Sequence, residues 1–124
     1  MIDQATLLLD GQEIPLRHYR LVVGQDSEQT TTAPLRTHIH LTVEAIRQEV
    51  LIDWATSGRA LKDGQILLED HMKSLRRVSF RAARCLHYEE QCQEGQGEFA
   101  AIIVLAPESV KFATKPTERK AFNR

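Results

Sequence analysis

The clearest helical pattern lies between residues 45 and 58. Its apolar side chains recur at positions i, i+4, i+5, i+8 and i+9 and share one stripe: Ile46, Val50, Leu51, Trp54 and Ala55. Gly58 stands where a left-handed residue commonly ends a helix. At about 1.5 Å per residue, such a helix would be about 20 Å long. The pattern therefore predicts one amphipathic helix that packs on a larger core.

A long alternating pattern follows, from Leu75 to Tyr88. One side of this segment is mainly apolar: Val78, Phe80, Ala82, Leu86 and Tyr88. The other side is mainly polar: Arg77, Ser79, Arg81, Cys85 and His87. A period of two is typical of a strand that packs on a core with one face, and this segment is longer than the usual five or six residues. The polar face must therefore meet water or a partner.

The remaining segments are predicted to be shorter strands joined by turns. The predicted strands are Ala5–Leu9, Leu16–Val23, Arg36–Val43, Gln65–Glu69 and Glu98–Ala106. Turn signals lie at residues 10–12 and 62–64, and the threonine-rich segment 24–35 is predicted to be a loop. One helix on a strongly curved sheet indicates a mainly β fold, a small β-barrel with one flanking helix. We expect a single domain over residues 1–112 and a basic, flexible tail over residues 113–124.

Composition narrows the classes of partner. The chain has 124 residues and a formal net charge of −1 at pH 7, which argues against general affinity for nucleic acid. No run approaches the roughly 18 apolar residues of a membrane-spanning helix, so we expect no membrane insertion. The first residues, Met1 to Gln4, lack the basic and apolar segments of a secretory signal. We therefore expect synthesis in the cytoplasm without a signal peptide.

Two pairs of side chains are candidates for chemistry. His38 and His40 share one face of their predicted strand, and histidines at this spacing can bind a transition metal if a third ligand arrives. Cys85 and His87 share the polar face of the long strand and could form a thiol–imidazole pair. No spacing demands a third metal ligand, and no glycine-rich oxyanion hole accompanies the thiol. A polar strand face is the better interpretation, and we expect no enzyme activity, metal or cofactor.

Charges are separated along the long strand. Basic residues fall within segment 73–84 without an acid: Lys73, Arg76, Arg77, Arg81 and Arg84. Acidic residues fall within segment 89–98 without a base: Glu89, Glu90, Glu94 and Glu98. A solvated surface explains this separation, and so does head-to-tail complementarity between identical subunits.

Several local signatures occur in an order that resembles a known family. They are Leu9–Glu13 (LDGQE), Leu51–Trp54 (LIDW), Lys62–Ile66 (KDGQI), Leu75–Ala83 (LRRVSFRAA) and Tyr88–Glu90 (YEE). Together they resemble the tube protein of bacterial type VI secretion systems, Hcp or TssD, in the shorter divergent branch typical of Bacteroidetes. The resemblance runs from about Ala5 to Phe112 and covers nearly the whole chain.

The resemblance implies a small Hcp-like barrel that assembles as a homohexameric ring and is secreted through the type VI apparatus. Rings of this family stack into a hollow tube that carries effectors and works with spike and sheath components. Candidates for the lumen or for subunit contacts are then His38, His40, Thr42, Arg77, Ser79 and Arg81. Candidates for a loop that contacts the next subunit or ring are Gln25, Asp26, Glu28, Thr31 and Leu35.

Departures from the family pattern keep other hypotheses open. Segment 31–35 replaces glycines that the family carries before the third strand, and Arg84 replaces an aromatic residue. A chain that forms rings without tubes is therefore one alternative. A second is a monomeric barrel that binds a small ligand on its histidine and arginine face. A third is a thiol- or metal-dependent hydrolase.

Overall fold

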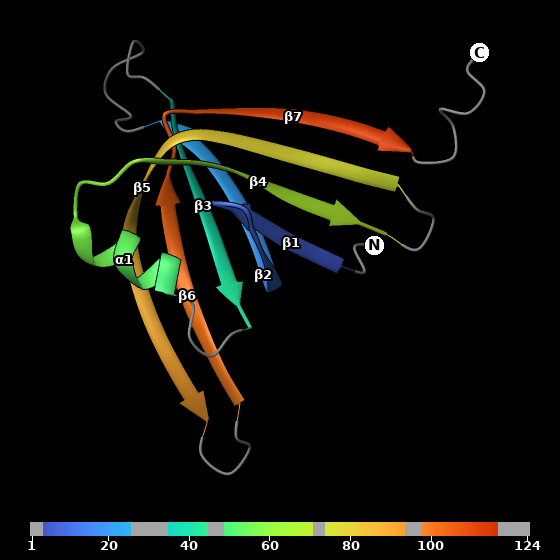
Figure 1. The fold of residues 1–124 in the computed structure, drawn as a ribbon. Coiled ribbons are helices and arrows are strands. Elements are labelled where there is room, and N and C mark those ends of the chain that lie inside the picture. The colour runs from blue at the N-terminus through green and yellow to red at the C-terminus, as the bar shows by residue number, and fades with distance from the viewer. Residues whose placement is uncertain (1–3, 26–34, 45–48, 71–73, 94–97, 117–124) are drawn as a thin grey trace.

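The computed structural model describes residues 4–25, 35–44, 49–70, 74–93 and 98–116 (Figure 1). The elements are β1 (Gln4–Leu9), β2 (Gln12–Gln25), β3 (Leu35–Val43), α1 (Glu49–Ser57), β4 (Lys62–Glu69), β5 (Ser74–Gln93), β6 (Glu98–Ala106) and β7 (Ser109–Pro116). Within these ranges, no helix has the length and apolar character needed to span a membrane. The predicted mainly β fold with one helix is confirmed.

Backbone pairing closes the strands into a barrel. The pairs are antiparallel, and the order across the sheet is β4-β1-β2-β3-β6-β5-β7. A further ladder between β4 and β5 joins the two ends of the series β4-β1-β2-β3-β6-β5. β7 lies outside this closed series, along the first part of β5. The small barrel predicted from the sequence is therefore confirmed, and β7 is left at the end of the sheet.

β5 pairs with two different strands of the barrel because it bends near its middle (Figure 1). Residues 75–83 pair with β4, and residues 84–93 pair with β6. At the bend, Ala82 has a φ of 50°, a backbone conformation that is costly for a residue with a Cβ. The N–H of Ala82 donates to Oδ1 of Asp63 at 2.8 Å. A carboxylate on β4 therefore stabilises the bend in β5.

Because of the bend, the alternation predicted for the long strand does not continue along its whole length. A second irregularity interrupts the pairing of β5 with β6. Each inserted residue moves the following side chains to the opposite face, so the buried positions pass from Val78 and Phe80 to Ala83. Leu86, predicted to lie on the apolar face, is 48% exposed. A uniform period of two is therefore wrong beyond residue 81.

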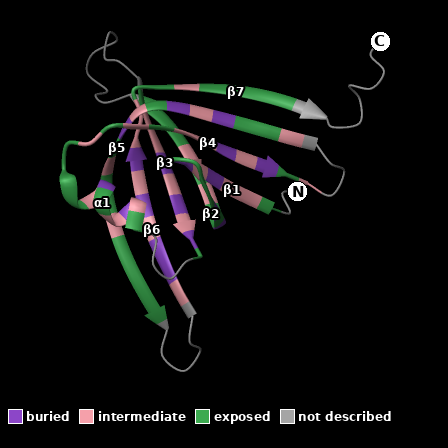
Figure 2. Ribbon diagram, in the orientation of Figure 1, coloured by how far each residue is buried: buried purple, intermediate pink, exposed green. Residues whose placement is uncertain are grey.

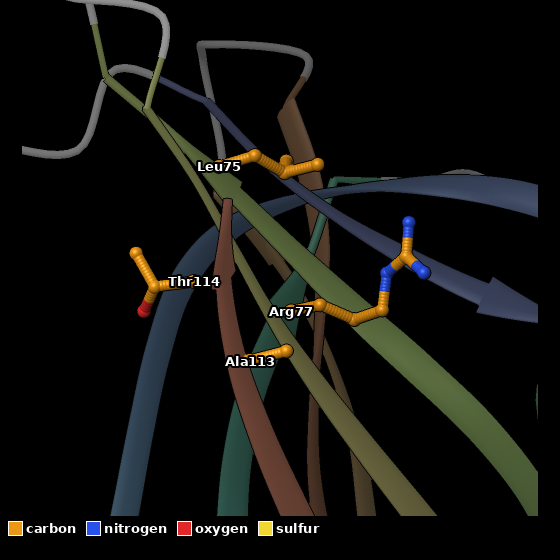
Figure 3. A pocket seen from close by; sticks show the side chains of 4 residues that line it. All are labelled: Leu75, Arg77, Ala113 and Thr114. Atoms are coloured by element: carbon orange, nitrogen blue, oxygen red, sulfur yellow. The ribbon is translucent and has the colours of Figure 1, made fainter. Parts of the chain in front are cut away.

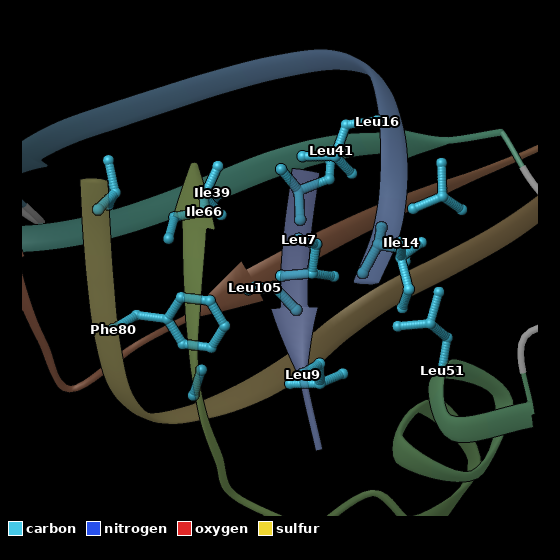
Figure 4. Packing of buried hydrophobic residues seen from close by; sticks show 14 of the residues in the cluster. Leu7, Leu9, Ile14, Leu16, Ile39, Leu41, Leu51, Ile66, Phe80 and Leu105 are labelled. Carbon is cyan, nitrogen blue, oxygen red and sulfur yellow. The ribbon is translucent and has the colours of Figure 1, made fainter. Parts of the chain in front are cut away.

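The barrel interior is one apolar core to which α1 and strands β1 to β6 contribute buried side chains (Figures 2 and 4). Trp54 joins α1 to this core. Its ring stacks on Phe80 with centroids 6.4 Å apart, and its Nε1 donates to the carbonyls of Ala60 and Ala83 at 3.1 and 3.2 Å. A Cβ at Gly64 would lie 2.6 Å from the Phe80 ring. Gly64 therefore makes room for the ring on which the tryptophan stacks.

Several boundaries differ from the sequence prediction. α1 ends directly before Gly58, whose φ is 76°, so the predicted end is confirmed, whereas residues 45–48 lie outside the described ranges. The turn predicted at residues 62–64 is wrong, because these residues begin β4. Residues 113–116 pair with β5, so the boundary expected at residue 112 lies inside β7. The rest of the predicted tail lies outside the described ranges.

Candidate functional site

Polar side chains gather on the outer face of the adjacent strands β2, β3, β6 and β5. The sequence has five histidines, and all except His71 lie in described residues. Each of the described histidines directly precedes a residue that packs on the core, so each histidine side chain points outward. We name this surface the histidine face. It comprises His18, Arg20, His38, His40, Thr42, Ile102, Val104, His87 and Glu89.

The strand register arranges most of the histidine face in two rows, and His38 lies in a neighbouring row, where it pairs with Val22. One row is Arg20, His40, Val104 and His87, and the other is His18, Thr42, Ile102 and Glu89. Directly opposite residues in antiparallel strands have Cβ atoms about 4.5–5.5 Å apart. The basic and titratable groups of β2 and β3 are therefore neighbours, and the apolar side chains of β6 separate them from β5.

This crowding affects the protonation of His40. Desolvation lowers the pKa of its imidazole, and the positive charge of Arg20 lowers the pKa further. Protonation of His38 and His18 acts in the same direction. The charged form of His40 is therefore disfavoured until a negative charge comes close.

The second part of β5 carries acidic residues that are already engaged. His87 Nε2 lies 3.1 Å from Glu89 Oε1, and Gln91 Nε2 donates to Glu89 Oε2 at 3.1 Å. These hydrogen bonds lower the pKa of Glu89. On the opposite side of the strand, the Tyr88 hydroxyl donates to Glu90 Oε2 at 2.7 Å. Burial, together with this hydrogen bond, raises the pKa of Tyr88 to about 12.

A second polar surface lies on the first part of β5, between β4 and β7. It consists of Arg77, Ser79 and Arg81, and we name it the arginine strip. These residues alternate with the buried Val78 and Phe80, so they point outward. The bend in β5 separates the arginine strip from the histidine face. The structure therefore places the predicted histidine and arginine candidates on two surfaces.

Two described pockets lie near the arginine strip and the bend. The first, about 210 Å³, is lined by Leu75, Arg77, Ala113 and Thr114 (Figure 3). The second, about 290 Å³, is lined by Leu61, Ala82, Arg84, Ala106, Pro107 and Glu108. Small-molecule sites commonly occupy about 300–1,000 Å³, and no histidine lines either pocket. Neither pocket supports a ligand site on the histidine face.

The predicted metal and thiol candidates show little organisation. Among the described residues, no three or more metal-ligating side chains come together. The Cys85 thiol donates to the backbone carbonyl of His87, with an Sγ–O distance of 3.5 Å. Burial raises the pKa of Cys85, which is opposite to what an activated thiol requires. This geometry does not support a cysteine nucleophile.

The candidates in the predicted loop are only partly described. Gln25 and Leu35 pair with each other at the ends of β2 and β3, so their assignment to a loop is wrong. Asp26, Glu28 and Thr31 lie outside the described residues. Their role in contacts between subunits or rings stays a prediction.

Sequence reasoning missed Arg20 and the strand β7. Arg20 alternates with Tyr19 and Leu21, which pack against the core, so a period of two could have placed it on the polar face. In β7, Val110 packs against the core, and Phe112 follows two residues later. This alternation was the available signal for a strand where a basic tail was expected.

β7 has one edge that is unpaired within the described part of the chain. Its other edge pairs with β5, and β7 ends the sheet. Phe112 on this strand is 50% exposed, and the guanidinium of Arg76 lies 5.1 Å from its ring centre. Unpaired strand edges tend to associate with another strand unless they are protected.

The fold agrees with the comparison to known families. The family model described as Hemolysin coregulated protein Hcp (TssD) matches residues 1–120. The chain belongs to the Hcp (TssD) family. A search of curated proteins by sequence finds no match.

Solved structures share the fold of this Hcp (TssD) family member at low sequence identity. Hcp1 from Flavobacterium johnsoniae is 16% identical, with a TM-score of 0.76 over 92% of this chain and 99% of that chain. Hcp1 from Salmonella typhimurium is 13% identical, with a TM-score of 0.73 over 93% and 92%. The sheath/tube terminator of the extracellular contractile injection system PVC is 16% identical, with a TM-score of 0.67 over 91% and 95%. The predicted family resemblance is confirmed.

Proposed function

We propose that this chain is a structural, non-enzymatic tube protein of a type VI secretion system or a related contractile injection system. Its subunits would assemble as homohexameric rings. The observation that carries this proposal is the edge of β7 that has no partner strand within the described residues and that lies beside the arginine strip. Family membership and the fold shared with Hcp1 proteins support it.

A closed ring needs two different contact surfaces on each subunit. The edge of β7 offers backbone groups for strand pairing, and the arginine strip beside it offers positive charge. The second part of β5 offers the negative charge of Glu90, which lies on the side of the strand opposite to the histidine face. Edge pairing would supply most of the contact, and the opposite charges would select its direction.

In such a ring, we assign the histidine face to the wall of the lumen. Its polar side chains suit a water-filled channel, whereas the apolar sides of the same strands fill the barrel. Stacked rings would form a tube that carries effectors and meets spike and sheath components. Likeness to a sheath/tube terminator and to a tube-terminating cap supports a place beside such components. The chain would be made in the cytoplasm and leave through the apparatus.

The alternative, a monomeric barrel with a small ligand, gains little support. It requires a cavity at the histidine face, and neither described pocket lies there. The separation of the histidine face from the arginine strip also divides the surface on which that hypothesis depends.

Light scattering after size-exclusion chromatography, followed by negative-stain microscopy, tests the ring. We expect a mass near six times the 14.1 kDa subunit, with ring-shaped particles. The double variant Arg77→Glu, Arg81→Glu should shift the mass toward that of the monomer. Arg59→Glu is the matched control, because Arg59 is exposed and lies outside both polar surfaces. A monomer of the unmodified chain at high concentration would contradict the proposal.

A further inference from the structure

The charge of the histidine face depends on pH. On β2 and β3 it presents His18, Arg20, His38 and His40, and segments 18–22 and 36–42 contain no acidic residue. Near neutral pH, Arg20 carries the permanent charge among these four residues, and Arg36 adds a second one because it lies two residues before His38 on the same face of β3. Histidine is the side chain that changes charge near physiological pH, so acidification adds positive charge to a small area.

The carboxylates around this group already have partners. Glu89 on β5 is engaged by His87 and Gln91. Glu44, after the end of β3, lies 4.0 Å from the guanidinium of Arg17. The histidine face includes only apolar side chains from β6, between β3 and β5. An external anion would therefore meet little competition from carboxylates at His38 and His40.

We propose that the histidine face binds an acidic polypeptide segment, and that it binds this segment more tightly at acidic than at neutral pH. The inference rests on the proposed function, because it names the chemical class of passenger that such a wall would hold. Carboxylates on alternate residues of an extended segment are spaced about 6.5–7 Å apart. His38 and His40 have the same spacing, since they too are alternate residues of a strand.

The surface favours a polypeptide over nucleic acid. Bases bind single-strand surfaces largely by stacking on aromatic rings. The histidine face offers imidazoles for this purpose but contains no phenylalanine, tyrosine or tryptophan, whose larger rings stack on bases more extensively. Ile102 and Val104 form a half-buried apolar stripe between the charged strands. This stripe suits the aliphatic parts of an acidic segment.

Binding and protonation should be linked. The neighbours Arg20, His38 and His18 disfavour the charged form of His40 in the free protein, whereas an adjacent carboxylate favours it. Binding therefore takes up protons. The affinity must therefore rise as the pH falls, provided that the peptide carboxylates remain ionised.

Isothermal titration of the full chain with a synthetic peptide of alternating glutamate and serine tests this proposal. At constant ionic strength, we expect about tenfold tighter binding at about pH 5.5 than at about pH 7.5, together with proton uptake. The double variant His38→Gln, His40→Gln should reduce this ratio to about twofold or less. Arg59→Gln is the control and should keep the full ratio, because Arg59 lies away from the histidine face.

Three results would overturn the inference: no peptide binding, binding that is independent of pH, or an unchanged pH ratio in the double histidine variant. Tighter binding of a thymidine oligonucleotide of equal charge would instead identify a nucleic-acid surface. Light scattering on the same samples separates this inference from the ring proposal. A monomer with pH-dependent peptide binding would support the inference and contradict the ring proposal. A ring that does not bind the peptide would support the ring proposal and contradict the inference.

Discussion

Neighbouring residues of β3 have opposite structural roles. Ile39 and Leu41 are 0% and 1% exposed and belong to the core. His38 and His40, which alternate with them, lie on the outer face beside Arg20 of β2. The inner face needs apolar shapes that fill a closed barrel, whereas the outer face presents charge to water and to partners.

This difference explains how a shared fold can carry different surfaces. The fold matches Hcp1 from Flavobacterium johnsoniae at 16% identity. Cores tolerate many apolar substitutions if volume and pattern are kept, so the inner face constrains the sequence loosely. The outer face has no such packing requirement. Its particular residues must therefore be examined to learn what each family member binds.

Truncating one buried and one exposed phenylalanine should give the largest contrast. Phe80 is 1% exposed and stacks on Trp54, so Phe80→Ala should cost about 3–5 kcal/mol of unfolding free energy. Phe112 is 50% exposed beside Arg76, so Phe112→Ala should cost about 0.5–1 kcal/mol. Urea unfolding followed by circular dichroism measures both. Equal costs would show that the exposed Phe112 is energetically part of the core.

The tryptophan at the helix–barrel contact offers the next test. Trp54→Phe keeps an aromatic ring but removes the Nε1–H that donates to the Ala60 and Ala83 carbonyls. Two buried or partly buried carbonyls then lose a donor and a small void opens, so we expect a loss of about 1–3 kcal/mol. Thermal unfolding provides the measurement. Thr56→Ala on the exposed side of α1 is the control, and a comparable loss there would contradict this role for Trp54.

The alternation of β3 and the C-terminal end of α1 could be predicted because each depends on residues close in the sequence. The bend in β5 could not. Ala82 carries no local signal for a positive φ, and its N–H is held by Asp63, a residue of another strand. Lys62 to Gly64 had the composition of a turn, but pairing with β5 makes this segment part of β4. Tertiary contacts overrode the local preference.

The histidine face could be predicted only in part, because only part of it depends on residues that are close in the sequence. His38 and His40 share a strand, so their common face follows from the period of two. Their position beside His18 and Arg20 depends on the register of β2 against β3. Such a register is set by the core and the connection, and a slip of one residue would exchange the faces. The full surface therefore became visible only in the fold.

The carboxylate at the bend should have a moderate effect. Asp63→Ala leaves the Ala82 N–H without its acceptor and should cost about 1 kcal/mol. Asp63→Asn keeps an oxygen acceptor at the same place and should therefore lose less unfolding free energy. Urea unfolding ranks the two variants, and light scattering shows whether the bend is required for rings. Equal stability of both variants and the unmodified chain would mean that the bend does not depend on this hydrogen bond.

The smallest effect is expected on the outer face, at Glu89. Hydrogen bonds with His87 and Gln91 hold its pKa below the ordinary value of 4.5, so the folded chain binds this proton less readily than the unfolded chain. The stabilisation is therefore present above about pH 4.5 and is lost as the pH falls through the folded pKa. Glu89→Gln should slightly flatten the dependence of the urea midpoint on pH between about pH 5 and pH 3. The same flattening in the exposed control Glu13→Gln would assign the effect to net charge, and the outer face would then contribute recognition without local stabilisation.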